Sequence, residues 1–303
     1  MKKIELQLLV TTCIAAVILI LTNFESVSKE VAFFESFKQT ETYKSYLALK
    51  SSESAFWSDI KGTKSNTGEI TNILNDAPVT ETPKTPIEPQ KITAPVKFLL
   101  IGDSMMLVGF GPALENSLLK NNGVSVVREG VYSTGLNRID YFDWFTKSDE
   151  LINQHKPDVL IVMFGANDGQ GIKDKSGKAH ELGSESWKEV YRERVRVYLS
   201  RVSPKLKKLY WVGHPITGND NFLAKFQAMN PIYKSECEKF PNAVFIDTWE
   251  RFAVNGAYSQ TISDDNGLRQ IAKQSDGVHV TDFGGKVLTD FVMKSVLKDV
   301  EIK

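Results

Sequence analysis

The sequence predicts an α/β fold in which helices cover both faces of a parallel sheet. Short apolar runs rich in β-branched residues recur along the last two thirds of the 303-residue chain. A stretch of helical length separates most of these runs, which is typical of parallel strands joined by helices. The composition, 42% hydrophobic and 24% charged, is that of a globular protein long enough to bury a full core.

Five strands and five helices follow from this alternation. Each predicted strand is a nearly continuous apolar run, as expected for a strand buried on both faces. The strands are expected at residues 96–101, 124–127, 159–164, 209–212 and 244–246. The helices are expected at residues 112–120, 138–154, 187–201, 222–240 and 283–297.

The N-terminus predicts a membrane anchor at residues 1–24. Residues 6–24 contain no charged side chain and follow Lys2 and Lys3, so the run is long enough to span a bilayer with its positive end inside. The alternative is a cleaved secretory signal, with Ser26 and Ser28 at a weak cleavage site. The apolar run is long for a signal peptide and no Ala-x-Ala site follows it, which favours an uncleaved anchor.

Two segments connect the anchor to the folded part of the chain. Residues 25–61 place aromatic and aliphatic side chains at roughly helical spacing, which predicts a juxtamembrane helical segment. Residues 62–94 are rich in Pro and Thr and predict an extended linker, so the globular domain is expected at residues 95–303. Lys plus Arg equals Asp plus Glu at 37 each, which argues against a nucleic-acid partner.

Three short blocks contain the residue types that serine acyl transfer requires. Ser104 follows the first strand, Asn167 follows the third, and Asp276 lies three residues before His279. In a parallel sheet the residues after the strands meet at one edge. A serine hydroxyl is a weak nucleophile until a base accepts its proton and donors stabilise the oxyanion. We therefore expect Ser104 as nucleophile and His279 as base, oriented by Asp276; a helix N-cap is the alternative role for Ser104.

The oxyanion donors expected from the sequence are the Asn167 side chain and the amide of Gly135, which lies in the loop after the second strand. An Asx turn is the alternative role for Asn167. Further candidate substrate contacts lie beside these blocks or near the same edge of the sheet, namely Asp103, Asp168, Trp144 and His214. No cofactor and no metal ion is expected.

These blocks resemble the SGNH (GDSL-like) hydrolase superfamily. Gly102-Asp103-Ser104, Gly135, Gly165-x-Asn167-Asp168 and Asp276-x-x-His279 match its four motifs in order, within residues 96–297. The resemblance implies a flavodoxin-like three-layer α/β/α sandwich and the residue roles given above. It also implies that the Ser104 amide is a third oxyanion donor.

Further segments resemble the membrane-anchored bacterial branch of that superfamily, a family of unknown function (DUF459-like). They are residues 141–144, 211–215 and 276–281. Activities in the superfamily include esterases, carbohydrate deacetylases and O-acetyltransferases. The resemblance and the anchor together imply a single-pass inner-membrane protein with a periplasmic domain, which acts on envelope glycan and has a membrane-bound O-acyltransferase as a possible partner.

Three functions from different classes remain open. The first is an extracytoplasmic serine esterase or O-acetyltransferase, and the second is a non-catalytic subunit or scaffold that keeps the fold. The third is a metal phosphoesterase with Asp103, Asp168, Asp276 and His279 as ligands, although these residues lack a recognised metal-site spacing.

Overall fold

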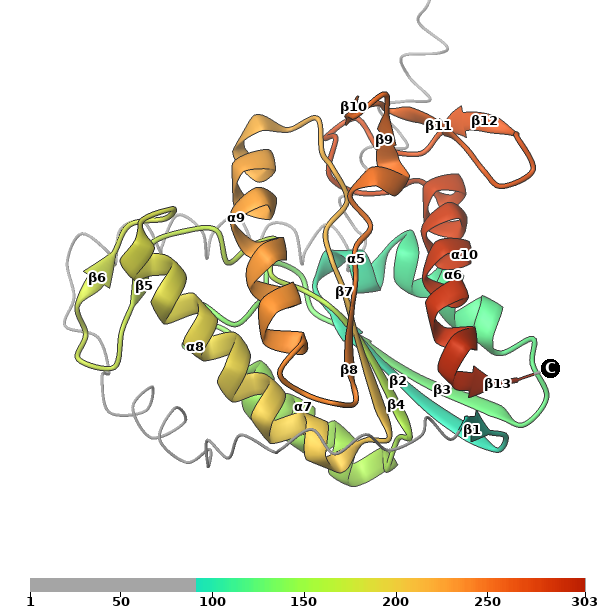
Figure 1. Ribbon diagram of the computed structural model, residues 1–303, viewed down its shortest axis with the longest axis horizontal. Coiled ribbons are helices and arrows are strands. Elements are labelled where there is room, and N and C mark those ends of the chain that lie inside the picture. The colour runs from blue at the N-terminus through green and yellow to red at the C-terminus, as the bar shows by residue number, and fades with distance from the viewer. Residues whose placement is uncertain (1–90, 303) are drawn as a thin grey trace, which may run out of the picture. The chain divides into compact units, whose positions relative to one another are not determined.

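The computed structural model describes residues 91–302 and has a five-stranded parallel sheet at its centre (Figure 1). The strand order is β3-β2-β4-β7-β8, and every neighbouring pair runs parallel. The strands are β2 (Val96–Gly102), β3 (Val124–Gly130), β4 (Val159–Met163), β7 (Lys208–Val212) and β8 (Ala243–Ile246). The five predicted strands are all present, and the predicted parallel sheet is confirmed.

Helices cover both faces of this sheet, which gives three layers. One face carries α7 (Trp144–His155), α8 (Glu185–Val202) and α9 (Asp220–Cys237). The other carries α5 (Ser104–Leu107), α6 (Phe110–Leu118) and α10 (Asp282–Asp299).

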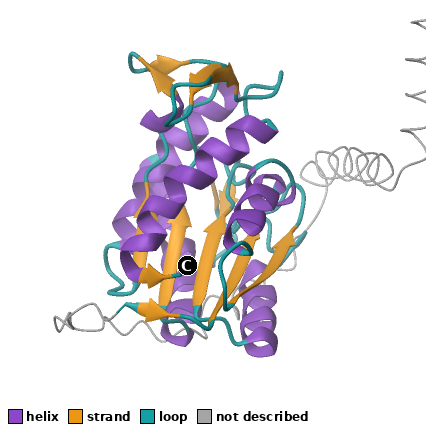
Figure 2. Cartoon of the chain, turned by 90° about the vertical axis from the view of Figure 1, so that its right-hand side faces the viewer, coloured by secondary structure: helices purple, strands orange, loops and turns teal. Residues whose placement is uncertain are grey.

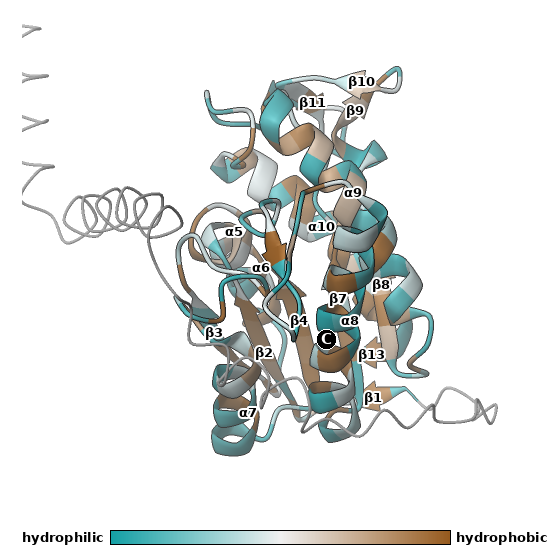
Figure 3. Ribbon diagram, turned by 90° about the vertical axis from the view of Figure 1, so that its left-hand side faces the viewer, coloured by the Kyte–Doolittle hydropathy of each residue, from teal (hydrophilic) through white to brown (hydrophobic). Residues whose placement is uncertain are grey.

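Side chains along β2 alternate between two apolar cores. Leu99 and Ile101 pack with α7, α8 and α9, whereas Phe98 and Leu100 pack with α6 and α10. This alternation follows from the two-residue period of a strand. It explains why β2 and β4 are brown, hence hydrophobic, in the middle of Figure 3.

Aromatic rings fill the core beneath α7, α8 and α9. Trp144 stacks on Phe164 with ring centroids 5.5 Å apart, and Phe164 meets Trp211 edge-on at 5.3 Å. Trp211 in turn stacks on Tyr233 of α9 at 4.6 Å. Phe164, in the middle of this row of rings, directly follows the carboxyl end of β4.

Four short strand pairs flank the main sheet and were not predicted. They are β1 (Ile92–Thr93) with β13 (Val300–Glu301), β5 (Ile172–Lys173) with β6 (Ala179–His180), β9 (Ala253–Val254) with β10 (Ala257–Tyr258), and β11 (Thr261–Ser263) with β12 (Arg269–Ile271). The last two pairs lie together at the top of Figure 1 and are drawn in orange at the top of Figure 2.

Capping side chains decide where the helices begin. The helix expected from residue 138 begins instead at Trp144, because the Asp143 carboxylate accepts hydrogen bonds from the Phe145 and Thr146 N–H groups. Thr281 caps α10 in the same way, because its hydroxyl oxygen accepts a hydrogen bond from the Gly284 N–H group. These caps fix the helix starts close to the carboxyl edge of the sheet.

The predicted anchor at residues 1–24, the juxtamembrane segment at 25–61 and most of the predicted linker lie outside the described residues. At the end of that linker, Ile92 and Thr93 pair with the last strand of the chain. Within residues 91–302, no helix combines the length and the apolar character needed to cross a bilayer.

Candidate active site

Ser104 lies at the turn where β2 passes into α5. The residue at the end of β2 must be glycine, because a Cβ at Gly102 would lie 2.1 Å from the Met163 carbonyl oxygen of the neighbouring strand β4. Asp103 caps α5 by accepting a hydrogen bond from the Met105 N–H at 3.0 Å, which makes Ser104 the first residue of the helix. Its hydroxyl therefore lies at the carboxyl edge of the sheet, where ligands bind in open α/β folds.

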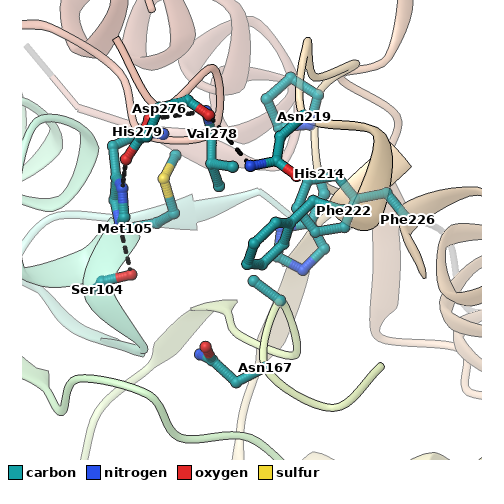
Figure 4. Close-up of a pocket in the computed structure, with 12 residues that line it drawn as sticks. Ser104, Met105, Asn167, His214, Asn219, Phe222, Phe226, Asp276, Val278 and His279 are labelled. Atoms are coloured by element: carbon teal, nitrogen blue, oxygen red, sulfur yellow. Dashed lines mark hydrogen bonds and ion pairs between the residues drawn. The ribbon is translucent and has the colours of Figure 1, made fainter. Parts of the chain in front are cut away.

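His279 connects Ser104 to Asp276. Its Nε2 lies 2.8 Å from Ser104 Oγ, and its Nδ1 lies 2.6 Å from Asp276 Oδ2 (Figure 4). The predicted residues, 175 positions apart in the sequence, thus form one hydrogen-bonded series. When Nδ1 carries the ring proton, it donates to the carboxylate, and Nε2 can then accept a hydrogen bond from the hydroxyl.

Asp276 is held as the ionised partner of the imidazole. Its Oδ1 accepts the N–H groups of Val278 at 2.8 Å and His279 at 3.0 Å. Burial alone would raise the pKa of Asp276, but the bonds from the His279 ring and these two amides outweigh it and lower that pKa. Gly277 makes the turn possible at φ +72°.

Asn167 projects from the loop after β4 and lines the same pocket as Ser104 (Figure 4). Its Nδ2 donates to the Thr134 carbonyl at 3.2 Å, which leaves the second N–H of the amide for another acceptor. The loop needs glycine at position 165, where φ is +112° and a Cβ would lie 2.0 Å from the Tyr233 hydroxyl. The amide is therefore held in one orientation.

Gly135 follows Thr134 directly and packs against the Asp168 carboxylate. A Cβ at position 135 would lie 2.1 Å from Asp168 Oδ1, so no larger residue fits. Within the described part of the chain, neither the Gly135 nor the Ser104 N–H donates to another group. Gly135 is not among the residues that line the pocket.

Asp168 is a correction to the predicted substrate contacts. Its carboxylate is buried and accepts from the Leu136 N–H at 2.7 Å, the Asn137 N–H at 2.9 Å and the Tyr191 hydroxyl at 2.6 Å. Burial raises the pKa of Asp168, although these hydrogen bonds and the charge of Arg194 act to lower it. Asp168 therefore holds the Gly135 loop in place and does not reach the pocket.

Trp144 is a second correction. The side chain is 0% exposed, and its Nε1 donates to the Thr134 hydroxyl at 2.9 Å. Since the ring stacks on Phe164 inside the core, it cannot contact a substrate. Its apolar surface and its one donor are both used to support the Thr134 loop.

Asp103 is a third correction, because its carboxyl is fully buried behind Ser104. Burial raises the pKa of Asp103 to about 7, although the Met105 amide and the charge of His279 oppose this. Asp103 is not among the pocket residues and acts as the cap of α5.

His214 does lie at the pocket, but as a buried wall. It is 1% exposed and stacks on Phe226 with ring centroids 4.3 Å apart. Burial lowers the pKa of His214 to about 3, so its ring is neutral. Among residues 91–302, no group hydrogen-bonds its Nε2.

The pocket beside Ser104 has a volume of about 100 Å³ and is mostly apolar. Its lining consists of Ser104, Met105, Ala166, Asn167, His214, Pro215, Asn219, Phe222, Phe226, Asp276, Val278 and His279 (Figure 4). Sequence reasoning did not single out Asn219, Phe222 or Phe226. The one signal available for them was their place after the fourth strand, at the edge that also carries Ser104.

The four residues considered as metal ligands are not gathered at one point. Asp168 binds the Gly135 loop and Asp103 caps α5, whereas Asp276 and His279 bind each other. In the described residues, no three His, Cys, Asp or Glu side chains are grouped as a metal site requires.

Comparisons with known proteins identify the family of the chain. A family model described as "Protein of unknown function (DUF459)" matches residues 97–295. Among proteins of curated function, none matches the sequence significantly.

Solved structures of an acetylxylan esterase from Geobacillus stearothermophilus are similar to the chain. The TM-score is 0.51 for the enzyme and 0.50 for two of its catalytic mutants, in which a histidine or a serine is replaced by alanine. Identity is 18–19%, over 68% of this chain and 96% of the esterase. A likeness at this identity shows a shared fold.

Proposed function

The chain belongs to the family of unknown function DUF459, and we propose that it is a serine esterase acting on short acyl esters of carbohydrate. One observation carries the proposal: Asp276, His279 and Ser104 form a continuous hydrogen-bonded series that ends in a pocket. The alternative role of Ser104 as a helix N-cap is wrong, because Asp103 is the N-cap of α5. Capping a helix would also give no reason for His279 to hydrogen-bond the Ser104 hydroxyl.

The proposed reaction has two halves. His279 Nε2 accepts the Ser104 proton as Oγ attacks the ester carbonyl, and the resulting imidazolium then protonates the departing alcohol oxygen. Asp276 keeps the imidazole in the required tautomer and stabilises its charge. In the second half, His279 removes a proton from an incoming hydroxyl that attacks the acyl-Ser104 ester, and returns it to Oγ.

Three N–H groups are proposed to bind the oxyanion. They are the amides of Ser104 and Gly135, which have no partner within residues 91–302, and the second Asn167 Nδ2 proton. Donors placed in advance stabilise developing negative charge without reorganisation. Asp168 contributes indirectly to binding of the oxyanion, because it holds the loop that carries Gly135.

The pocket supports a small acyl group. Its volume of about 100 Å³ is well below the roughly 300–1,000 Å³ typical of sites for drug-sized ligands. Phe222, Phe226 and Val278 form apolar walls that suit a methyl group. The structural match to an acetylxylan esterase supports an acetylated carbohydrate as the substrate class. Catalytic mutants of that esterase replace a serine or a histidine.

We further propose that the reaction takes place outside the cytoplasm on envelope glycan. The support is the uncharged run at residues 6–24 behind Lys2 and Lys3. In this setting a sugar hydroxyl replaces water as the second nucleophile, and the protein is then an O-acetyltransferase. The proposed partner that donates the acyl group is a membrane-bound O-acyltransferase. Protection of the domain from protease in intact spheroplasts would contradict this location.

Acetate release from a chromogenic acetyl ester tests the enzymatic proposal. Wild type should turn over, and both Ser104→Ala and His279→Ala should lose at least about 10³-fold in kcat. Ser117→Ala and His155→Ala are matched controls outside the site and should retain wild-type rates. Adding soluble glycan separates the two fates of the acyl group: acetylated sugar identifies a transferase, and acetate alone identifies an esterase.

The two alternatives predict other results. A non-catalytic scaffold would release no acetate with any ester and would still bind glycan equally well as Ser104→Ala. A metal phosphoesterase would lose its activity on treatment with a chelator, whereas the serine mechanism would be unaffected.

A further inference from the structure

Each backbone carbonyl of the turn from Asp276 to His279 accepts a hydrogen bond. The donors come from two neighbouring segments, the loop after β7 and the chain after β12. The four bonds are Asn219 Nδ2 to the Asp276 carbonyl at 3.4 Å, Thr217 Oγ1 to Gly277 at 2.7 Å, Lys273 Nζ to Val278 at 2.8 Å, and the Gln274 N–H to His279 at 2.8 Å.

Lys273 differs from the other donors in carrying an ionisable group. Its side chain is 0% exposed, and its Nζ lies 5.1 Å from the centre of the Phe252 ring. Within residues 91–302 no carboxylate forms an ion pair with it. A buried, unpaired ammonium is costly, and Thr217 shows that a neutral group can hold the adjacent carbonyl. Packing alone therefore does not account for a lysine here.

We propose that Lys273 is a positioning residue: it holds the Asp276–His279 turn through the Val278 carbonyl, and its charge favours the ionised carboxylate of Asp276 that orients His279. The inference rests on the proposed serine mechanism, in which His279 must be neutral to accept the Ser104 proton. A cation buried beside the turn favours the ionised carboxylate of Asp276.

Two titratable groups interact with Lys273. Burial lowers the pKa of Lys273 to about 7, and the charge of Asp276 opposes this shift. After burial, the charge of Lys273 is the next cause that lowers the pKa of His214. Lys273 is thus protonated in the acidic range, where protonation of Asp276 would remove the acceptor of the His279 Nδ1 proton.

The test is the pH profile of kcat/KM for acetyl ester hydrolysis by Lys273→Met. We expect its acidic limb to move to higher pH by roughly 0.5 unit or more, since the charge that favours ionised Asp276 is gone. Thr217→Val removes the neighbouring donor without removing a charge, so it should lower kcat and leave the limb in place. Lys286→Met, at an exposed lysine paired with Asp290, is the matched control and should behave as wild type.

The outcomes separate this inference from the proposed function. An inactive wild type refutes the serine mechanism itself. An active wild type with an unmoved acidic limb in folded Lys273→Met overturns only the role of Lys273. If that variant does not fold, Lys273→Gln, which keeps a donor and removes the charge, gives the same readout. Failure of both variants to fold would assign Lys273 to the folding core and overturn the proposal.

Discussion

Gly135→Ala is the substitution whose effect the structure specifies most closely. The new Cβ would lie 2.1 Å from Asp168 Oδ1 and 2.5 Å from Oδ2. The carboxylate cannot retreat, because the Leu136 and Asn137 N–H groups and the Tyr191 hydroxyl hold it. The backbone at position 135 must move instead.

The required movement sets the expected loss of activity. Ordinary van der Waals contact begins near 3.4 Å, so the backbone must shift by more than 1 Å. A misplacement of about 1 Å in a catalytic site can cost about 10²-fold. Loss of one oxyanion donor costs about 10²–10³-fold in kcat, or about 3–4 kcal/mol. We therefore expect kcat to fall by about 10²–10³ with a smaller change in KM.

Steady-state hydrolysis of an acetyl ester measures this loss. Gly171→Ala is the matched control, because a Cβ there would have its nearest neighbour at 3.6 Å, an ordinary contact. Circular dichroism should show that both variants are folded. Wild-type kcat in folded Gly135→Ala would refute the assignment of this amide to the oxyanion site.

Four further predictions follow from the same contacts. Trp144→Phe should lower the free energy of unfolding by about 2 kcal/mol in urea titrations and leave KM unchanged, because it removes core volume and the hydrogen bond to Thr134. Phe222→Ala should widen the pocket and raise the butyrate-to-acetate ratio of kcat/KM by about 10-fold. The pKa of Asp276 is lowered in the folded state, so the contribution of its carboxylate to stability is present above about pH 4 and is lost below it. The free energies of unfolding of wild type and Asp276→Asn, measured by urea titration, should therefore converge below about pH 4. The pKa of Lys273 falls from 10.5 to about 7 on folding, so between these pH values the unfolded chain binds more protons than the folded one. The difference in free energy of unfolding between wild type and Lys273→Met should therefore rise in favour of wild type as the pH rises, by up to about 1.4 kcal/mol per pH unit.

Topology explains why the central residues of the site could be predicted from the sequence. Ser104 and Asn167 follow adjacent buried strands, β2 and β4, and parallel strands bring their carboxyl ends to one edge. The pairing of His279 with Asp276 follows from a spacing of three residues in a short turn. Once the strands were recognised, little freedom remained for these side chains.

The direction of a side chain is what the sequence did not reveal. Asp168 is adjacent to Asn167 in the sequence, yet the Asp168 carboxylate is buried against the Gly135 loop, whereas the Asn167 amide lines the pocket. Trp144 follows its own helix cap, Asp143, and turns into the core. Such choices depend on which partners the tertiary fold supplies, here Tyr191 and Thr134.

The pocket walls were missed for a different reason. Phe222 and Phe226 are four residues apart on α9, and their spacing is equally typical of a helix face packed in a core. Only the path of the loop after β7 brings the first turns of α9 over Ser104. Apolar specificity residues of this kind carry no chemical signature in the sequence.

Site-mapped labelling by a fluorophosphonate tests the central claim most directly, because it reports the activated hydroxyl without requiring the natural substrate. The account predicts a single phosphonate on the peptide that contains Ser104, formed at least about 10³-fold more slowly in His279→Ala. Labelling of another residue, or an equal rate in the variant, would contradict it.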